Sequence, residues 1–560
     1  MRLPSLLLAS FVAAACTKST HHLTVPVEEA GDPPEVAVGE RLFLETRFAE
    51  FFASHLAGGD VNAPLAAGDP TLDEVVDADG TASPGPFLGQ AMNCRQCHLV
   101  DELQSAGGER MRTYGDFARR SPIPDRADGR ATTPRNSPPL VNASLARPDA
   151  FFLHFDGEFA TTEELVRATL TGRNYGWRAD EHAAAVAHVA RVIREDDGSG
   201  GLAAAFGALS YADTFAGAAH VPPELLLPAP LRIDVATATD AELLDAVAAL
   251  VEAYLDGLVF QQDASGDFSG SPFDAFLARN GLPRHADPGE SARDFSRRLR
   301  AEVSALGNPL FVTPADGAFA HHAQPFQFGP DELEGLRIFL AEPATVPPSA
   351  GELASGGIGN CIACHSGPAF TDFGFHNVDT AQAEYEEIHG GGSFAALSVP
   401  DLSTRAGDAG QFLPPSASFP DAEGVFLRVP SAGDARFTDL GVWNVFANPG
   451  VPGPQSELKV ALCAANGLDP ATTADDVVLP LALALFKTPG LRDLADSAPY
   501  MHTGQFDALE DVLGHYLTSS ALARSGAIRN GDPQLQGIAL AGSDFTPLAA
   551  FLRSLTDDYE

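Results

Sequence analysis

Two short clusters of cysteine and histidine constrain this chain more than any other feature. Both read C-x-x-C-H: two cysteines separated by two residues and followed at once by a histidine. The positions are Cys94, Cys97 and His98 in the first cluster and Cys361, Cys364 and His365 in the second. Two thiols at this spacing can bond both vinyl groups of a porphyrin, while the adjacent histidine faces the iron. The pattern predicts two covalently bound c-type haems, with both histidines as iron ligands.

Other uses of these cysteines fit the pattern less well. A zinc site wants four ligands, and no third or fourth cysteine lies near either cluster. A redox dithiol would not need a histidine in both copies. The two remaining cysteines are Cys16, near the N-terminus, and Cys463, which stands alone as a small apolar residue. A disulfide framework is therefore not indicated.

The N-terminus, MRLPSLLLASFVAAAC, is typical of an export signal. A charged start at Arg2 is followed by an apolar run too short to span a bilayer as a helix. Cys16 resembles the acylated cysteine of a bacterial lipoprotein box. We expect a lipoprotein-type signal over 1–16 and a polar, Pro-rich tether over 17–38. The mature protein is expected in the periplasm, lipid-anchored to a bacterial membrane, the outer one being favoured; ordinary secretion is the alternative.

The charge balance narrows the choice of partners. The 560 residues include 75 acidic and 35 basic side chains, for a net charge of −40. Nucleic acid is excluded as a partner because it needs a basic face. The excess of acid favours steering of a basic or cationic partner, although a generally acidic, salt-adapted proteome would explain it equally well. The length predicts two or three domains.

Helical periodicity and one weak repeat indicate the fold class. Apolar residues recur at helical spacing over 180–196 and 240–260, and no train of alternating strands is present. The segment GERLFLETRF (39–48) precedes the first cluster, and GLRIFLAEPA (335–344) precedes the second. Both share G-x-R-x-F-L. The sequence predicts a mainly α fold in which a duplicated unit forms two cytochrome c-type haem domains with long loops.

The domain boundaries follow from this repeat. We expect an N-terminal haem domain over 39–199 and a C-terminal haem domain over 331–560. Residues 200–330 carry neither cluster and are predicted to be an inserted helical region.

Several longer motifs resemble those of the di-haem cytochrome c peroxidase and MauG superfamily. They are CRQCH, TPRNSPPLVNASL (133–145), FFLHFDGEFATTEELV (151–166), CIACHSGPAFTDFGFHNV (361–378) and FKTPGLRDLADSAPYMHTGQFDALEDVLGHY (486–516). The resemblance implies that peroxide or oxygen is handled at the N-terminal haem, while the C-terminal haem passes electrons. About 200–330 and a segment near 450–485 do not match the short members.

The resemblance also bears on the free face of each iron. Family peroxidases that need reductive activation carry a histidine shortly before the R-N-x-P motif. Residues 99–135 contain no histidine, so the first haem is expected to be open, unless Met111 or Tyr114 caps it.

For the second haem, short peroxidases place a methionine fourteen residues past the H-x-G histidine, and MauG places a tyrosine. From His502 that position is Tyr516, on a helix that Asp507 is expected to cap. The alternatives are that Tyr516 is a core aromatic, or that the neighbouring His515 competes, although it points about 100° away on a helix.

A calcium ion lies between the haems of the family. Its protein ligands map to the side chain of Asn136 and the backbone carbonyls of Ser497 and Pro499. Ligation by oxygen alone suits calcium. The other interpretation of Asn136 is an ordinary turn residue.

Three pocket positions depart from the family pattern. The interhaem tryptophan maps to Phe155, the active-site glutamine to Leu165 and the catalytic glutamate to Tyr175. Peroxide reduction needs a group that moves a proton between the two oxygens. The acid–base candidates here are Tyr175, Glu158 and His154. Trp177 could replace the missing electron relay, or it could be a packed aromatic.

Three functions remain open from the sequence. The first is a peroxidase-like oxidoreductase that takes electrons from a small cytochrome c or a cupredoxin. The second is an oxygenase like the rubber-cleaving di-haem enzymes. The third is a MauG-like enzyme that oxidises side chains of a partner protein, or a haem protein that only transfers electrons.

The predicted lipid anchor is directly testable. Replacing Cys16 by Ser removes the acylated thiol, so the protein should move from the membrane fraction to the soluble fraction of cells. Immunoblotting of the two fractions measures this, and unchanged fractionation would leave only an ordinary signal peptide.

Overall fold

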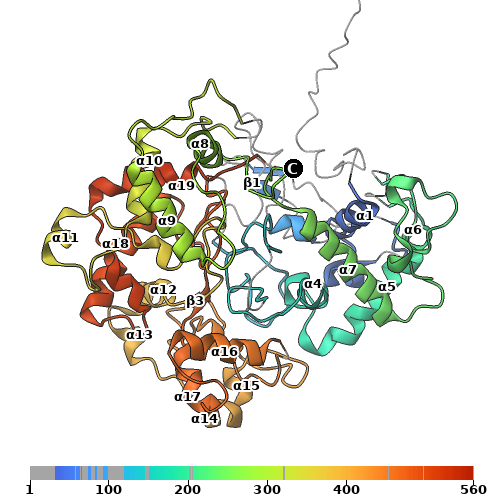
Figure 1. Ribbon diagram of the computed structural model, residues 1–560. Coiled ribbons are helices and arrows are strands. Elements are labelled where there is room, and N and C mark those ends of the chain that lie inside the picture. The colour runs from blue at the N-terminus through green and yellow to red at the C-terminus, as the bar shows by residue number, and fades with distance from the viewer. Residues whose placement is uncertain are drawn as a thin grey trace, which may run out of the picture.

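Helices are the main regular secondary structure of the described part of the chain, and long loops connect them (Figure 1). The computed structural model describes residues 32–56, 59–63, 65, 74–76, 82–84, 92–98, 119–145, 151–200, 203–204, 206–319, 322–451, 453–495 and 497–558. The predicted signal, most of the tether, Met111 and Tyr114 lie outside these residues. Two antiparallel strand pairs are described, β1 (Glu74–Val76) with β2 (Ala82–Pro84) and β3 (Phe375–His376) with β4 (Phe486–Lys487). The mainly α prediction is confirmed.

The first hydrophobic cluster is a helical unit that we call the first half. Its helices are α1 (Pro34–Phe43), α2 (Glu50–His55), α4 (Thr162–Leu170), α5 (His182–Glu195), α6 (Tyr211–Ala216) and α7 (Asp240–Gly257). The central α7 packs against α1, α4 and α5. Thr239 caps it in a capping box with Glu242. The predicted cap of α4 is also present, because Thr161 accepts a bond from the backbone N–H of Glu164.

The second hydrophobic cluster forms the second half. Its helices are α8 (Pro272–Asn280), α9 (Ala292–Ala305), α10 (Pro330–Leu340), α11 (Ala350–Ser355), α18 (Leu509–Ser525) and α19 (Phe545–Arg553). Phenylalanine rings fill much of its interior; the rings of Phe276 and Phe328, for example, stack with centroids 4.2 Å apart.

A third cluster forms a lobe, which we define as residues 380–485. Its helices are α12 (Thr380–His389), α13 (Ser393–Ala396), α14 (Leu402–Gly407), α15 (Ala409–Phe412), α16 (Gln455–Ala465) and α17 (Asp475–Val478). At its centre Arg405 is 1% exposed and lies 4.7 Å over the ring of Trp443. The Arg405 guanidinium donates to backbone carbonyls, including that of Phe446 at 2.7 Å. Phe152 of the first half packs into the same cluster, so the lobe is joined to that half through its core.

Single 3₁₀ turns connect these units. Outside the cysteine clusters they are Arg173–Tyr175, Ala179–Glu181, Pro223–Leu225, Ala229–Leu231, Val442–Asn444, Leu479–Ala482, Pro533–Gly537 and Gly542–Asp544. Residues 200–330 contribute to two cores: Leu209 to Leu258 belong to the first cluster, and Phe273 to Phe328 belong to the second.

The repeated G-x-R-x-F-L segment has the same structural role in both halves. In the first half α1 crosses α7, and in the second α10 crosses α19. A methyl group on Gly39 would lie 2.0 Å from the carbonyl oxygen of Leu250, and one on Gly335 would lie 1.9 Å from that of Pro547. Glycine is therefore required where each pair of backbones touches, which explains the shared residue and supports the predicted duplication.

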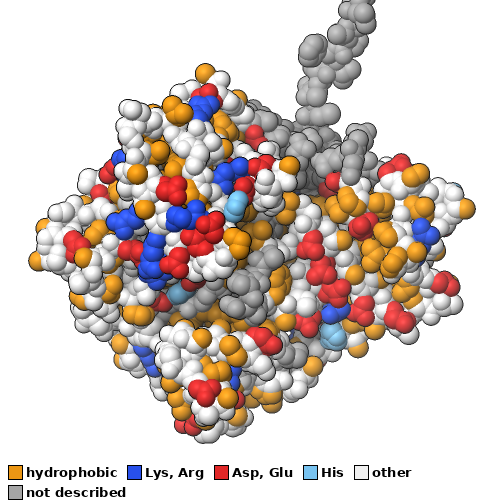
Figure 2. All heavy atoms as spheres, in the orientation of Figure 1, with side chains coloured by type: hydrophobic (Ala, Val, Ile, Leu, Met, Phe, Trp, Pro, Cys, Tyr) orange, Lys and Arg blue, Asp and Glu red, His pale blue; other side chains and the backbone are white. Residues whose placement is uncertain are grey.

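The surface carries the acidic excess seen in the composition. On the face in Figure 2, acidic side chains are spread over both halves, and basic side chains gather among acids toward the left. Arginines of α9 are paired: Arg293 and Arg297 both bind Glu342. Among the helices of the described residues, none is long and apolar enough to cross a membrane.

A buried ion network holds α1 to the segment after α5. The carboxylate of Asp196, whose side chain is 0% exposed, binds Arg41 at 2.9 Å and Arg47 at 3.0 Å. It also accepts the backbone N–H of Tyr211 at 2.9 Å.

Replacing Asp196 by Ala should destabilise the first half by about 3–5 kcal/mol, because the buried guanidinium of Arg41 loses its carboxylate and that of Arg47 keeps only Glu45. Denaturant unfolding of the purified protein measures the loss. Asp245→Ala is the control, since Asp245 pairs with Arg167 on the surface, where an ion pair contributes little. Equal stability of the two variants would contradict this account of the network.

Candidate haem cavity and active site

Both C-x-x-C-H clusters line one cavity of about 1040 Å³. Its wall includes Cys94, Cys97, His98, Cys361, Cys364 and His365. Residues of the first half, the second half and the lobe all contribute to the lining. A space of this size, reached by both clusters, is large enough for groups far bigger than water.

The two clusters adopt the same local conformation. Each begins with a 3₁₀ turn, Cys94–Gln96 in the first and Cys361–Ala363 in the second. Each histidine then bonds back to the first cysteine: the N–H of His98 donates to the Cys94 carbonyl at 3.1 Å, and that of His365 donates to the Cys361 carbonyl at 2.7 Å. This turn brings both thiols and the imidazole to the same side of the backbone.

Backbone carbonyls fix the orientation of both imidazoles. The Nδ1–H of His98 donates to the carbonyl of Pro138 at 2.7 Å, and the Nδ1–H of His365 donates to that of Phe370 at 2.9 Å. Each bond sets the tautomer and leaves the Nε2 lone pair available to a metal. Burial also lowers the pKa of both imidazoles, which keeps them neutral.

The thiols fit covalent attachment to a haem, because each turn offers two cysteines and a histidine at the same cavity. Burial raises the pKa of Cys94 and of Cys361 to about 12 and that of Cys97 to about 11. The hydroxyl of Tyr175 lies 3.2 Å from the Cys94 sulfur, so this predicted acid–base candidate sits beside the attachment point. The residues present therefore fit two thioether-linked haems.

Tyr516 of α18 lies on the cavity wall near the second cluster. Burial raises the pKa of its hydroxyl, with a further contribution from the nearby Cys364 and Cys361. Its neighbour His515 is engaged elsewhere, because its Nε2–H donates to the carbonyl of Val378 at 2.9 Å. The expected cap was wrong: the N-cap of α18 is Ala508, with no side-chain bond. That Tyr516 binds the second iron stays a prediction.

The predicted calcium ligands lie together at the same cavity. The amide of Asn136 donates from Nδ2 to the carbonyl of Pro499 at 2.6 Å, and its backbone N–H donates to the carbonyl of His502 at 2.7 Å. Ser497 lines the cavity as well. Turning the amide over would present Oδ1 beside the Pro499 carbonyl, which is the donor set that calcium prefers. The calcium site itself stays a prediction.

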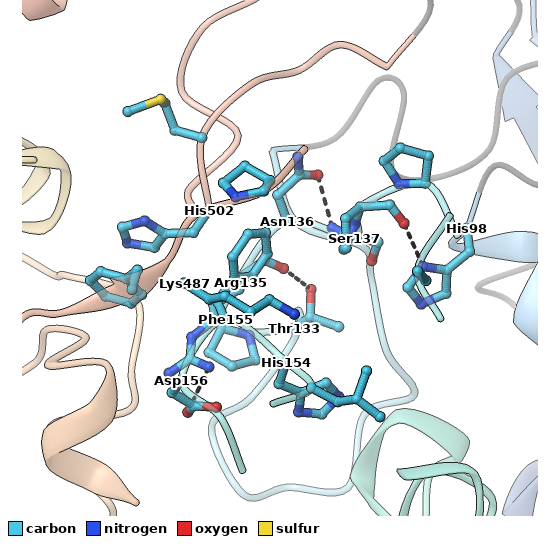
Figure 3. Close-up of a pocket in the computed structure, with 18 of the residues that line it drawn as sticks. His98, Thr133, Arg135, Asn136, Ser137, His154, Phe155, Asp156, Lys487 and His502 are labelled. Carbon is cyan, nitrogen blue, oxygen red and sulfur yellow. Dashed lines mark hydrogen bonds and ion pairs between the residues drawn. The ribbon is translucent and has the colours of Figure 1, made fainter. Parts of the chain in front are cut away.

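A short hairpin brings His154, Asp156 and Glu158 together on the cavity wall, and Figure 3 shows the first two of them. His154 has a left-handed backbone with φ of 59°, between the bridged residues Leu153 and Phe159. Its Nδ1 lies 3.0 Å from an oxygen of Glu158. Burial would raise the pKa of Glu158, but the bond to His154 outweighs it and holds this pKa low. A strained residue of this kind is common at functional sites.

A second network of ion pairs holds Asp156, the carboxylate between His154 and Glu158 in the hairpin. Arg135 binds Asp156 at 2.7 Å and Asp439 of the lobe at 2.6 Å, and all three side chains are buried. This pairing fixes the hairpin against the lobe and leaves His154 and Glu158, which are both partly exposed, at the cavity.

The remaining predicted residues are spread around the cavity. Phe155 and Leu165 line it. Trp177 is 5% exposed in the core of the first half, and its Nε1–H donates to the carbonyl of Phe48 at 3.1 Å. The structure thus brings together Glu158 and His154, whereas Tyr175 contacts the first thiol and Trp177 is bound in a helical core.

His502 is a residue whose surroundings the sequence did not reveal. Its ring stacks on Phe486 with centroids 3.5 Å apart, and the Phe155 ring lies 6.2 Å away. Burial lowers its pKa to about 3, and its Nε2 has no hydrogen-bond partner. The motif PYMHTG singled this histidine out, but only the fold shows that it bridges two aromatic rings of the cavity wall.

Comparison with known proteins gives local sequence matches. No family model matches the chain. Over 70 residues, 12% of the chain, it is 39% identical to the methylamine utilization protein MauG of Methylophilus methylotrophus. Over 58 residues, 10% of the chain, it is 47% identical to MauG of Methylorubrum extorquens. The chain spans 19% and 16% of the length of these relatives.

The sequence similarity to MauG is therefore local, and it is found in a chain whose two C-x-x-C-H turns line a common cavity. Among solved structures, the chain is similar to the diheme peroxidase BthA from Burkholderia thailandensis, with 17% identity and a TM-score of 0.43 over 94% of this chain and 86% of that one. A MauG-like protein associated with microbial copper homeostasis gives 16% identity and a TM-score of 0.40 over 95% and 92%.

The place of Tyr516 on the cavity wall yields a prediction. If its phenolate binds the second iron, Tyr516→Phe should change the low-spin signal of the purified holoprotein and leave the high-spin signal of the first haem intact. Tyr516→Met should raise the second midpoint potential, because a thioether favours ferrous iron more than a phenolate does.

Electron paramagnetic resonance and redox titration measure these changes. Tyr385→Phe is the control, because Tyr385 is a buried tyrosine of the lobe that binds the carbonyl of Ala435. Identical spectra for Tyr516→Phe and the wild type would show that another group holds the second iron.

Proposed function

We propose that this protein reduces hydrogen peroxide at the haem held by His98, with electrons that enter through the haem held by His365. The observation that carries the proposal is the single cavity reached by both C-x-x-C-H turns, with each imidazole oriented by a backbone carbonyl. Bound haem would supply iron that can be oxidised and re-reduced. The coarser assignment, a di-haem oxidoreductase, is supported by the two C-x-x-C-H turns and by the local similarity to MauG.

His154 and Glu158 are our proposal for the proton-transfer pair. Reduction of hydrogen peroxide consumes two electrons and two protons and releases two water molecules, so a group must deliver protons to the peroxide oxygens. His154 lines the same cavity as His98, and Glu158 fixes one nitrogen of the His154 ring. The other ring nitrogen is then free to exchange a proton. Tyr175 is less suited, because burial raises its pKa well above the usual value.

The electrons are proposed to come from a small cytochrome c or a cupredoxin, one electron at a time. The net charge of −40 favours a donor with a basic face. Between the haems, the path is proposed to pass near Phe155, His502 and Phe486, whose rings form a continuous aromatic contact. Because phenylalanine is hard to oxidise, this path should act by tunnelling rather than through an oxidised residue.

A second candidate is oxidation of side chains on a partner protein, as the resemblance to MauG implies. The local MauG matches and the position of Tyr516 on the cavity wall favour it. This function also needs an open first haem, so it differs from the first candidate in the electron source and not in the cavity.

Peroxide turnover tests the proposal. Holoprotein mixed with hydrogen peroxide and a reduced small cytochrome c should oxidise the cytochrome, followed by its absorbance. His154→Gln should lower kcat by about 100-fold or more, since general acid–base catalysis contributes at least that much. His182→Gln, a change on the exposed face of α5, is the control and should leave the rate unchanged.

The outcomes separate the two levels of the proposal. If the reduced cytochrome is not oxidised although peroxide changes the haem spectrum, the assignment as a peroxidase with a small-protein donor is wrong. Oxidation of side chains on a partner protein is then the favoured function. If turnover proceeds and His154→Gln does not slow it, the assignment of the proton-transfer pair is wrong.

A further inference from the structure

Three arginines meet on the cavity wall where the first half contacts the lobe. Arg130 and Arg173 belong to the first half, and Arg428 belongs to the lobe; all three line the cavity. We call them the arginine cluster. The residues around them are partly solvent-exposed, including Gly129 on one side and Glu423 on the other, so the cluster lies near the outer end of the cavity.

The cluster joins two loops through their backbones. Arg130 donates from Nη2 to the carbonyl of Glu423 at 3.4 Å. In the other direction, Arg428 donates to the carbonyl of Gly129 at 3.4 Å, and its Nε donates to that of Glu423 at 2.9 Å. Neither Arg130 nor Arg428 forms an ion pair with a carboxylate among the described residues. Neutral carbonyls hold these side chains in place but do not cancel their charge.

Asp128 is the carboxylate that pairs directly with the cluster among the described residues, through the Nε of Arg173 at 2.7 Å. Glu423 also favours the charged form of Arg428, although its carboxylate lies 3.3 Å from Arg436. The carboxylate of Asp421, which lines the cavity too, lies 3.4 Å from Arg178. The three guanidiniums therefore outnumber the carboxylates that act on them, in a protein whose composition is strongly acidic.

Two further observations indicate that a negative group is missing. The Nη1 of Arg173 is buried and has no hydrogen-bond partner, and such orphaned donors are rare and costly. Burial lowers the pKa of Arg130 to about 10, and repulsion from Arg428 and Arg173 adds to this. The positive charges of these guanidiniums are thus less stable in the cluster than they would be in water. An anion among them would relieve both defects.

The surrounding wall suggests the rest of the ligand. Beside the cluster, the lobe contributes the apolar residues Pro414, Pro415 and Leu427 to the cavity. The planar guanidinium fork is suited to paired bonds with a carboxylate. A ligand that satisfies both parts of the wall has a flat or apolar body and an acidic group.

We propose that Arg130, Arg173 and Arg428 form a binding site for a carboxylate at the junction of the first half and the lobe. Two sources share this chemistry: a propionate of the first haem, and the carboxylate of a free aromatic or aliphatic acid that enters the cavity. The site is inferred from the geometry of two loops, and its test does not use peroxide turnover. The result is therefore independent of the proposed function.

Calorimetry on the holoprotein tests the free-acid source. Benzoate is the probe, and benzamide, which has the same shape without the charge, is its control. If the cluster takes a free acid, benzoate should bind and benzamide should not. Arg130→Gln and Arg428→Gln should each weaken benzoate binding by tenfold or more, and Arg428→Lys should weaken it less, because it keeps the charge but loses the fork.

Redox titration of the same proteins tests the propionate source. If a propionate occupies the cluster, benzoate should not bind, and both Gln variants should lower the midpoint potential of the first haem, because the uncompensated propionate charge then stabilises ferric iron. Arg436→Gln is the matched control for both measurements, since Arg436 is an exposed arginine of the same lobe that is paired with Asp434.

Circular dichroism of each variant confirms that it is folded before either result is read. If benzoate does not bind and neither Gln variant changes the first potential relative to Arg436→Gln, the arginine cluster serves only to join the two loops and the proposal is overturned.

Discussion

The cavity between the two C-x-x-C-H turns is the constraint on which the rest of the structure depends. Protein interiors are normally packed as densely as organic crystals, so a space of about 1040 Å³ lined by both turns marks where bound groups would complete the packing. Its walls come from all three hydrophobic clusters, and each turn is fixed by a histidine that bonds a backbone carbonyl. The helical cores thus fix the positions of the turns and hairpins that supply the candidate haem-binding and proton-transfer residues.

Much of this frame could be predicted from the sequence, because its signals are local. The spacing of two thiols and a histidine, the helical periodicity of α5 and α7, and the cap at Thr161 each depend on neighbours within one or two turns. The cap expected at Asp507 failed for a local reason too: the helix begins after Ala508 instead. The glycine of the repeat was visible, but its role at a helix crossing was not, since that role depends on residues more than 200 positions away.

The active-site pairings were beyond sequence reasoning, because they join segments far apart in the chain. His154 and Glu158 are only four residues apart, yet it is the left-handed turn and the anchoring of Asp156 by Arg135 and the lobe that bring them to the cavity. The stacking of His502 between Phe486 and Phe155, and the meeting of Arg130 with Arg428, depend equally on tertiary packing. No periodicity or spacing encodes such contacts.

The two glycines of the helix crossings bear on how far the halves can diverge. Because α1 and α7, like α10 and α19, touch backbone to backbone, the separation of each pair is set by main-chain atoms and not by the sizes of side chains. The exposed positions on these helices can then change without altering the angle or distance at which the helices meet. A duplicated unit built in this way can keep its architecture while its two copies lose most of their sequence similarity, as long as Gly39 and Gly335 are kept.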